Sequence, residues 1–350
     1  MREPKPARPA PNDRAPNNHP PGDQLPGGEI RDAIGGEFDL IANYFAPLAG
    51  PGAFGLGDDA AVMTPPPGQQ LVFTADAIIS GVHFLPADPA VDVAWKLLGV
   101  NLSDLASMGA GGLGYLITTA WPRDLDQTWI AAFAEGLGQA QAAYGISLLG
   151  GDTVATGGPM CLSLTAIGTV PDHGALRRNG ARPGDRIFVS GRIGDAGAGL
   201  KILRDGLTDG AADERQMAIA RYRRPSPRLA LGQALRGLAS SCIDISDGLV
   251  ADLGHLATQS SVRMAVELPL VPLSPLAPLI GGAVGAVTAG DDYELLFTAP
   301  PEQTRRILDL AAETGVAVGV IGGVEKGQGV GLTNGAGETI ALDRAGYRHF

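Results

Sequence analysis

The stretch Leu71–Phe84, LVFTADAIISGVHF, is the part of the sequence from which a fold and a site can be predicted. Its first three residues are apolar and β-prone, which predicts a buried strand over 71–73. The strand is expected to give way to a loop at Asp76, and His83 follows seven residues later. The stretch therefore predicts a carboxylate at the end of a buried strand, with a histidine close by in the sequence.

Aspartates beside small residues recur along the chain. Two stand just upstream, in the turn Gly57-Asp58-Asp59-Ala60. The others follow downstream, at Asp104, Asp152, Asp244, Asp247, Asp291 and Asp292. One Asp–Gly pair says little, because both residues are ordinary in turns. Their number, however, predicts one shared site for hard cations. Since Mg²⁺ is typically bound by carboxylates, waters and substrate phosphates, the pattern favours phosphoryl transfer assisted by several Mg²⁺ ions.

The length and composition predict two domains. A chain of 350 residues with 45% hydrophobic content can bury more than one core. Strand-like and helix-like patterns alternate in both halves, which predicts an α/β or α+β fold. We expect a boundary near Pro171–Gly174, and hence domains over residues 36–170 and 171–350.

The first 35 residues differ from the rest. They hold eight prolines, five basic and five acidic residues, and no periodic apolar pattern. We therefore expect Met1–Gly35 to be a disordered Pro-rich tail. It lacks the apolar segment of a secretory signal.

Charge and cysteine usage restrict the partners. The net charge of −11 argues against binding to nucleic-acid phosphates. The uncharged stretch Leu268–Ala289 is interrupted by four prolines, so we expect loops and short strands there and no membrane span. Cys161 and Cys242 lie in apolar runs and are expected to be small core residues of a reduced, cytoplasmic protein.

A helix after the central stretch carries two more polar candidates. Asp88 is a plausible N-cap, Pro89 is expected at the first helical position, and Gly109 ends the helix. Asn101 and Asp104 are three residues apart, so they share a face of this largely apolar helix. Asp104 then needs a cation or strong donors. The alternative is an exposed aspartate or one that caps a neighbouring turn.

Two segments resemble known phosphate-binding motifs but do not satisfy them. The segment 109–114 fits G-x-G-x-x-G but follows a helix and precedes a strand, the reverse of the dinucleotide-binding order. Gly191–Gly199 resembles a P-loop, but Leu200 stands where that motif requires lysine. The chain also lacks a serine-nucleophile elbow, a catalytic Cys/His pairing and the protein-kinase loops.

The chain resembles the thiamine-monophosphate kinases, within the aminoimidazole-ribonucleotide-synthetase-like superfamily. The resemblance covers Gly36 to Phe350 and rests on motifs in a fixed order: GEFDLIANYF, GDDAA, TADAIISGVHF, NLSDLASMGA, GGDT, RPGD, RPSPR, DISDGLVADLGH, GDDYEL and GYRHF. It implies two α/β domains, a homodimer paired through N-terminal-domain strands, and ATP-dependent phosphorylation of thiamine monophosphate to thiamine diphosphate.

The resemblance also implies roles for individual residues. Those at Mg²⁺-binding positions are Asp59, Thr74, Asp76, Asp104, Asp152, Asp244 and Asp247. Those at ATP-contacting positions are Tyr144, Gly151, Asp152, Arg178 and Ser246. Those at substrate-contacting positions are His83, Asp291 and Tyr347. No residue is expected to act as a general base, because a phosphate with a second pKa of about 6 is already ionised at neutral pH.

Two residues depart from the family pattern, and two have simpler interpretations. The family usually has a hydroxyl residue at Ala75 and glutamate at Asp291. Without the resemblance, His83 is equally a hydrogen-bonded loop histidine, and Tyr347 a terminal packing residue.

Two other functions stay open from sequence. A sister enzyme such as selenophosphate synthetase would use ATP to activate another small molecule, but it usually carries a reactive cysteine or selenocysteine and a lysine near its N-terminal glycine-rich segment, and this chain has neither there. A non-enzymatic nucleotide or metal sensor could share the fold.

Overall fold

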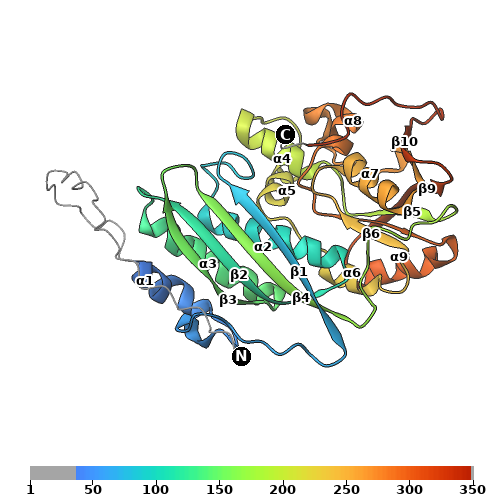
Figure 1. Ribbon diagram of the computed structural model, residues 1–350. Helices are drawn as coiled ribbons and strands as arrows, with labels where there is room; N and C mark the ends of the chain where they lie inside the picture. Colours follow the sequence, from blue (N-terminus) through green and yellow to red (C-terminus); the bar gives the residue numbers. More distant parts are fainter. Residues whose placement is uncertain (1–36, 348–350) are drawn as a thin grey trace, which may run out of the picture. The chain divides into compact units, whose positions relative to one another are not determined.

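The structure is a computed structural model that describes residues 37–347. The expected tail, Met1–Gly35, lies outside the described residues. All described residues belong to one compact unit. The mixture of strands and helices predicted from sequence is confirmed, because the chain forms two sheets covered by helices (Figure 1). The division into domains over 36–170 and 171–350 stays a prediction.

The first sheet has four strands in the order β1-β4-β2-β3. Their bounds are Gln69–Ile79 for β1, Gly111–Pro122 for β2, Ser147–Thr156 for β3 and Cys161–Pro171 for β4. Helices α2 (Ala90–Ser107) and α3 (Gln127–Tyr144) lie against one face (Figure 1). In β4 every second residue is buried, from Leu162 to Val170. This alternation places the apolar side chains of β4 against the helices and its hydroxyl side chains on the opposite face.

The strand β1 is longer than the sequence predicts. It pairs antiparallel with β4 from Gln69 to Ile79 without a break, and Asp76 stands opposite Leu164. The expectation that the strand gives way to a loop at Asp76 is therefore wrong. The expected burial of residues 71–73 is also wrong, because Leu71 is 38% exposed and Phe73 62% exposed on the face that the helices do not cover. The polar residues Thr74 and Asp76 are accommodated because β1 is an edge strand among the described residues, where one face and one side remain open.

The second sheet has six strands in the order β10-β7-β9-β5-β8-β6. Their bounds are Arg186–Ser190 for β5, Ser241–Asp244 for β6, Arg263–Glu267 for β7, Leu295–Ala299 for β8, Val318–Glu325 for β9 and Gly329–Thr333 for β10. Both faces are covered: α7 (Leu249–Ser260) contributes to one core, and α6 (Leu229–Ala234) and α9 (Thr304–Glu313) contribute to the other. Burial on both faces explains the continuous apolar runs of β5 and β8.

Two further helices lie between these elements, α4 (Asp195–Asp205) and α5 (Ala212–Arg223), and they pack on each other. The stretch 268–289 forms two short 3-10 turns, Leu268–Leu270 and Ala277–Ile280, and the helix α8 (Gly282–Thr288). The short strands expected there are wrong. Prolines near the starts of both turns fix a helical φ and remove the amide donors that a strand ladder would need.

The start of α2 also differs from expectation. Pro89 is the N-cap and the helix begins at Ala90, so Asp88 does not cap it. The Asp88 carboxylate instead accepts the Leu85 amide at 2.8 Å and pairs with Arg223 at 2.8 Å. Among the described residues, no helix is long and apolar enough to cross a bilayer. Both cysteines are free thiols; Cys242 is buried, as expected, and Cys161 is half-buried.

Candidate functional site

The strand β1 and the helix α2 bring three polar residues together. The Thr74 hydroxyl donates to the carboxylate of Asp104, and the backbone amide of Asp76 donates to Asn101 Oδ1 at 3.0 Å. Asn101 is fully buried, and its own amide donates to the Leu97 carbonyl. The shared helix face predicted for Asn101 and Asp104 therefore meets β1. Asp104 has the strong donor that its half-buried position requires.

The charge of Asp104 disfavours ionisation of the neighbouring Asp76 carboxylate. Asp76 is an exposed residue of a cavity wall, and partial loss of its hydration, together with the charge of Asp104, raises its pKa to about 6. The pKa of Asp104 is also raised by burial, although the Thr74 hydroxyl and the charge of Arg178 act in the opposite direction. Such a pair gains stability from a nearby cation.

A third carboxylate comes from the second sheet. Asp244 ends β6, is 4% exposed, and accepts the hydroxyl of Ser103 at 2.6 Å. Ser103 lies on α2 one residue before Asp104, so this bond joins the two halves of the chain. Burial, and then the charge of Asp104, raise the pKa of Asp244 to about 8.

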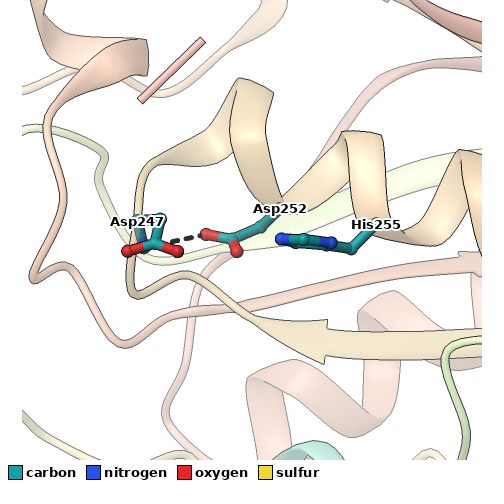
Figure 2. Close-up of side chains that lie close together, drawn as sticks. All are labelled: Asp247, Asp252 and His255. Carbon is teal, nitrogen blue, oxygen red and sulfur yellow. Dashed lines mark hydrogen bonds between the residues drawn. The ribbon is translucent and has the colours of Figure 1, made fainter. Parts of the chain in front are cut away.

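The loop after Asp244 is held by one buried side chain. A single oxygen of Asp252, in the first turn of α7, accepts the backbone amides of Ser246, Asp247 and Gly248 at 3.1 to 3.2 Å. Asp252 is 2% exposed, and burial, with the charge of Asp247, raises its pKa to about 7. Figure 2 shows Asp247, Asp252 and His255 side by side, with potential ligand atoms within 4.8 Å of one another. The three amide bonds fix the loop that carries Asp247.

The segment Gly290–Leu295 closes over this loop. The Asp291 and Tyr293 amides donate to the carbonyls of Ser246 and Ile245, at 2.9 and 2.8 Å. The approach is so close that a Cβ on Gly290 would lie 2.3 Å from the Ser246 carbonyl, so only glycine fits. Asp291 and Tyr293 both have positive φ, at 71° and 49°. Such strain is typical of functional sites.

Four successive side chains hold this segment in place. Asp291 pairs with Lys96 of α2 at 2.9 Å and accepts the Tyr293 hydroxyl at 3.2 Å. Asp292 accepts the Gly194 amide that precedes α4, at 3.0 Å. Glu294 accepts the Ser190 hydroxyl at 2.6 Å and Arg228 Nε at 2.7 Å. The strained backbone is thus fixed by contacts with α2, α4, β5 and the start of α6.

These elements enclose a cavity of about 600 Å³. The residues singled out from sequence that line it are Asp76, His83, Asp104, Arg178, Asp244, Ser246, Asp247, Asp291 and Tyr347. Asp252, Tyr293, Arg344 and the first turns of α4 complete the wall. Thr74 does not line the cavity itself, but its hydroxyl donates to Asp104, which does. The arrangement places four of the expected metal-binding carboxylates beside a guanidinium group.

Four expected site residues lie elsewhere. Asp59, Gly151 and Asp152 line a second cavity of about 780 Å³, on the face of the first sheet that α2 and α3 do not cover. Tyr144 packs against Trp95, with ring centroids 5.7 Å apart, and lines neither cavity. In this single chain the seven predicted metal-binding residues therefore form two groups.

The strand register explains this separation. One row of paired residues across the four strands contains Asp76, Leu164, Ile117 and Gly151. Asp76 and Gly151 are at the two ends of this row, and the two residues between them are buried. Asp152 is one residue further along β3, and successive side chains of a strand point to opposite faces. Asp152 therefore faces away from α2, whereas Asp76 faces toward it.

Comparison with known proteins shows the family to which the chain belongs. Two family models match: the N-terminal domain of AIR synthase related protein over residues 57–170, and the C-terminal domain of the same group over residues 182–334. The thiamine-monophosphate kinase of Escherichia coli strain K12 is 41% identical over 324 residues, which is 90% of this chain and 98% of that relative. The chain belongs to the thiamine-monophosphate kinase family.

Solved structures of the thiamine-monophosphate kinase family agree with this assignment. The crystal structure of the Stenotrophomonas maltophilia K279a enzyme has a TM-score of 0.74 and 40% identity, covering 81% of this chain and 91% of that one. A structure described as AaThiL complexed with AMPPCP and TMP has a TM-score of 0.72 and 31% identity, covering 85% of this chain and 97% of that one. The superfamily resemblance seen in the motifs is confirmed.

His83 and Tyr347 each have two interpretations from sequence, a substrate contact or a simpler structural role. His83 Nδ1 accepts the Ile79 amide at 3.1 Å, as a hydrogen-bonded loop histidine would, and the residue also lines the cavity. Tyr347 is 48% exposed and lines the same cavity, and its amide donates to the Asp247 carbonyl. Their substrate-contacting roles stay predictions, as do the other assigned site roles.

Sequence reasoning missed Lys96, Ser103, Arg228 and Asp252. Lys96 is 2% exposed in the apolar run Val93–Val100, and a lone charged residue in such a run is the signal that could have found it. Arg228 ends the motif RPSPR, which was noted without a role. Ser103 and Asp252 carry no comparable signal, because serine and aspartate are ordinary near helix ends.

We expect the stability of the ligand-free protein to fall as pH rises. Asp76 and Asp244 have pKa values raised to about 6 and about 8, whereas an unfolded aspartate titrates near 3.9. The folded chain thus binds protons more tightly, so their contribution is complete below about pH 4 and is lost by about pH 8. Urea unfolding in chelator at pH 5 and pH 8 measures the difference. Asp244→Asn should flatten it, and an unfolding free energy that rises across this range would contradict the assignment.

Proposed function

We propose that this chain transfers the γ-phosphoryl group of ATP to the phosphate of thiamine monophosphate, giving thiamine diphosphate and ADP. The observation that carries the proposal is the cavity in which Asp76, Asp104, Asp244 and Asp247 surround a space that Arg178 also lines. Family membership supports the choice of substrates. The pairing of four carboxylates with a guanidinium suits a site that handles two phosphorylated ligands together.

The donor set fits Mg²⁺, and several ions are proposed. Asp76, Asp104, Asp244 and Asp247 offer hard oxygen ligands, and Thr74 adds a hydroxyl that now donates to Asp104. Burial, and then the charge of Asp104, raise the pKa of Asp76 and of Asp244, so a cation bound among these carboxylates would favour their charged forms. Bound Mg²⁺ would supply this positive charge and screen the phosphates. Ala75 offers no side-chain ligand, so any contact there would come from its backbone.

The chain's own residues would position the two phosphorylated substrates and neutralise their negative charge. The accepting phosphate oxygen is ionised at neutral pH, because its second pKa is about 6, so no general base is needed. The oxygen forms a bond to the γ-phosphorus while the bond to the β–γ bridging oxygen breaks, and ADP leaves with that electron pair. The difficulty is the repulsion between two anions. Arg178 would offset it, and the rigid loop that carries Asp247 would hold the groups in line.

A turnover assay tests the proposal. Purified chain with Mg-ATP is given thiamine monophosphate, thiamine or an aminoimidazole precursor, and the products are resolved by chromatography. We expect thiamine diphosphate and ADP from the first substrate alone. Turnover of the aminoimidazole precursor would favour the sister-synthetase function, and nucleotide binding without turnover of any substrate would favour a sensor.

We further propose that the uncovered face of the first sheet pairs with a second copy of the chain. Large apolar side chains are exposed there, with Phe73 at 62%, Val154 at 46% and Leu116 at 40%. Contiguous exposed apolar area of this kind marks an interaction surface. Pairing would also cover the second cavity, where Asp59, Gly151 and Asp152 lie. The proposed location is the cytoplasm, where ATP is available and free thiols such as Cys242 persist.

Phe73→Glu is expected to convert a dimer to monomers, because a charge on this face would have to be buried without a partner. Light scattering after size exclusion measures the mass of each form. Leu308→Glu is the control, since Leu308 is 38% exposed on α9, which covers the second sheet. A parent chain that is monomeric at high concentration would contradict the proposed pairing.

A further inference from the structure

A buried lysine stands behind the wall of the cavity. Lys96 lies on α2 and is 2% exposed. Its ammonium nitrogen is 2.9 Å from Asp291 Oδ2 and 4.0 Å from the centre of the Tyr222 ring of α5. The ammonium thus has a carboxylate on one side and an aromatic face on another, which is the environment that a desolvated cation requires.

Stability alone does not account for this lysine. Replacing a buried ion pair with apolar residues of similar volume is often neutral or stabilising. The apolar neighbours Val93, Leu97 and Val100 on the same helix show that this part of α2 accommodates aliphatic side chains. A lysine here needs a further reason, and its partner supplies one, because Asp291 lines the cavity.

Both oxygens of Asp291 are held by the protein. Oδ2 accepts from Lys96 and Oδ1 accepts from the Tyr293 hydroxyl at 3.2 Å. Each carboxylate oxygen can accept two hydrogen bonds, so one acceptor position on each oxygen remains for a ligand. The side chain is 28% exposed, and its backbone has a φ of 71°. The carboxylate is therefore fixed in orientation and reaches the cavity.

We infer that Lys96 is a positioning residue that orients the Asp291 carboxylate toward a hydrogen-bond donor of the phosphate-accepting substrate. The inference rests on the proposed function. A carboxylate offers acceptors only and repels phosphate, so it suits the end of the substrate that carries N–H groups; in thiamine monophosphate that is the aminopyrimidine ring.

The test is a comparison of Michaelis constants for three variants. Lys96→Met keeps the length of the side chain and removes the charge, Asp291→Asn removes the carboxylate charge, and the double variant removes both. We expect Lys96→Met to raise KM for thiamine monophosphate by about tenfold or more and to leave KM for ATP within about twofold, since a misplaced contact far from the chemistry costs up to about a hundredfold. Lys201→Met is the control, because Lys201 pairs with Asp205 on the surface of α4.

The double variant keeps the inference testable if the single variant folds poorly. Lys96→Met leaves the charge of Asp291 without its partner, whereas the double variant leaves no unpaired charge. If Lys96 acts through Asp291, the double variant has the same KM for thiamine monophosphate as Asp291→Asn. Multiplied effects of the two substitutions, or equal rises in both Michaelis constants, would overturn the inference.

Turnover of thiamine monophosphate by the parent chain distinguishes a failure of this inference from a failure of the proposed function. A parent that turns over thiamine monophosphate, together with a Lys96→Met variant of unchanged KM, overturns the role of Lys96 alone. A parent that fails to turn over thiamine monophosphate overturns the proposed function and the role of Lys96 with it.

Discussion

Asp76→Asn is expected to lower turnover by orders of magnitude while leaving the ligand-free protein as stable as the parent, or more stable. Asp76 and Asp104 face one cavity, and the charge of Asp104 contributes to the raised pKa of Asp76. Two like charges about 4 Å apart repel by about 4 kcal/mol at an effective dielectric constant near 20, an upper bound that protonation and water reduce. Removing one charge relieves this repulsion, but asparagine supplies no charge to hold a cation. The substitution therefore weakens cation binding and turnover, while it relieves charge repulsion in the ligand-free protein.

Melting curves with chelator and with Mg-ATP measure both effects. A ligand that binds only the folded state raises the melting temperature by mass action, so the parent should show a large shift and Asp76→Asn a small one. Asp309→Asn is the control, since Asp309 is 55% exposed on α9 and pairs with Arg305. Equal ligand-induced shifts in the parent and in Asp76→Asn would rule out a shared cation site.

Arg178→Ala is expected to raise KM for ATP by about tenfold to a hundredfold, with a smaller effect on KM for thiamine monophosphate. Arg178 lines the cavity, and its charge acts on Asp104. A guanidinium that pairs with phosphate oxygens contributes about 1.5 to 3 kcal/mol, which corresponds to that range. Arg177→Ala is a matched control, because Arg177 is the preceding exposed arginine and does not line the cavity. Unchanged nucleotide affinity in Arg178→Ala would contradict its assignment.

The helix α2 could be predicted because local patterns determine it. Its start near Pro89, its end near Gly109 and its apolar face are all visible in the sequence. The predicted strand is shorter than β1, because Thr74 and Asp76 are polar and only the pairing with β4 shows that the strand continues through them. In 268–289 the prolines were interpreted as loop residues, although they also start short helical turns.

The site could be predicted only in part, because it depends on contacts between distant segments. The aspartates of the cavity were found by their small-residue surroundings, and the fold brings Asp76, Asp104, Asp244 and Asp247 to one place. The sequence could not show that Asp152 faces the other side of the sheet, since that depends on strand register. Nor could it show that Lys96 meets Asp291, because 195 residues separate them.

The helix α2 belongs to both halves of the chain, and this limits how the protein can move. Its apolar side chains lie in the core of the first sheet. Asp88, just before the helix, bonds to α5, and Lys96 and Ser103 on the helix bond to the segment before β8 and to β6. A hinge between the halves would break all of these bonds at once. Opening and closing around ligands must then come from local loop movements, and the halves should unfold together in a single calorimetric transition.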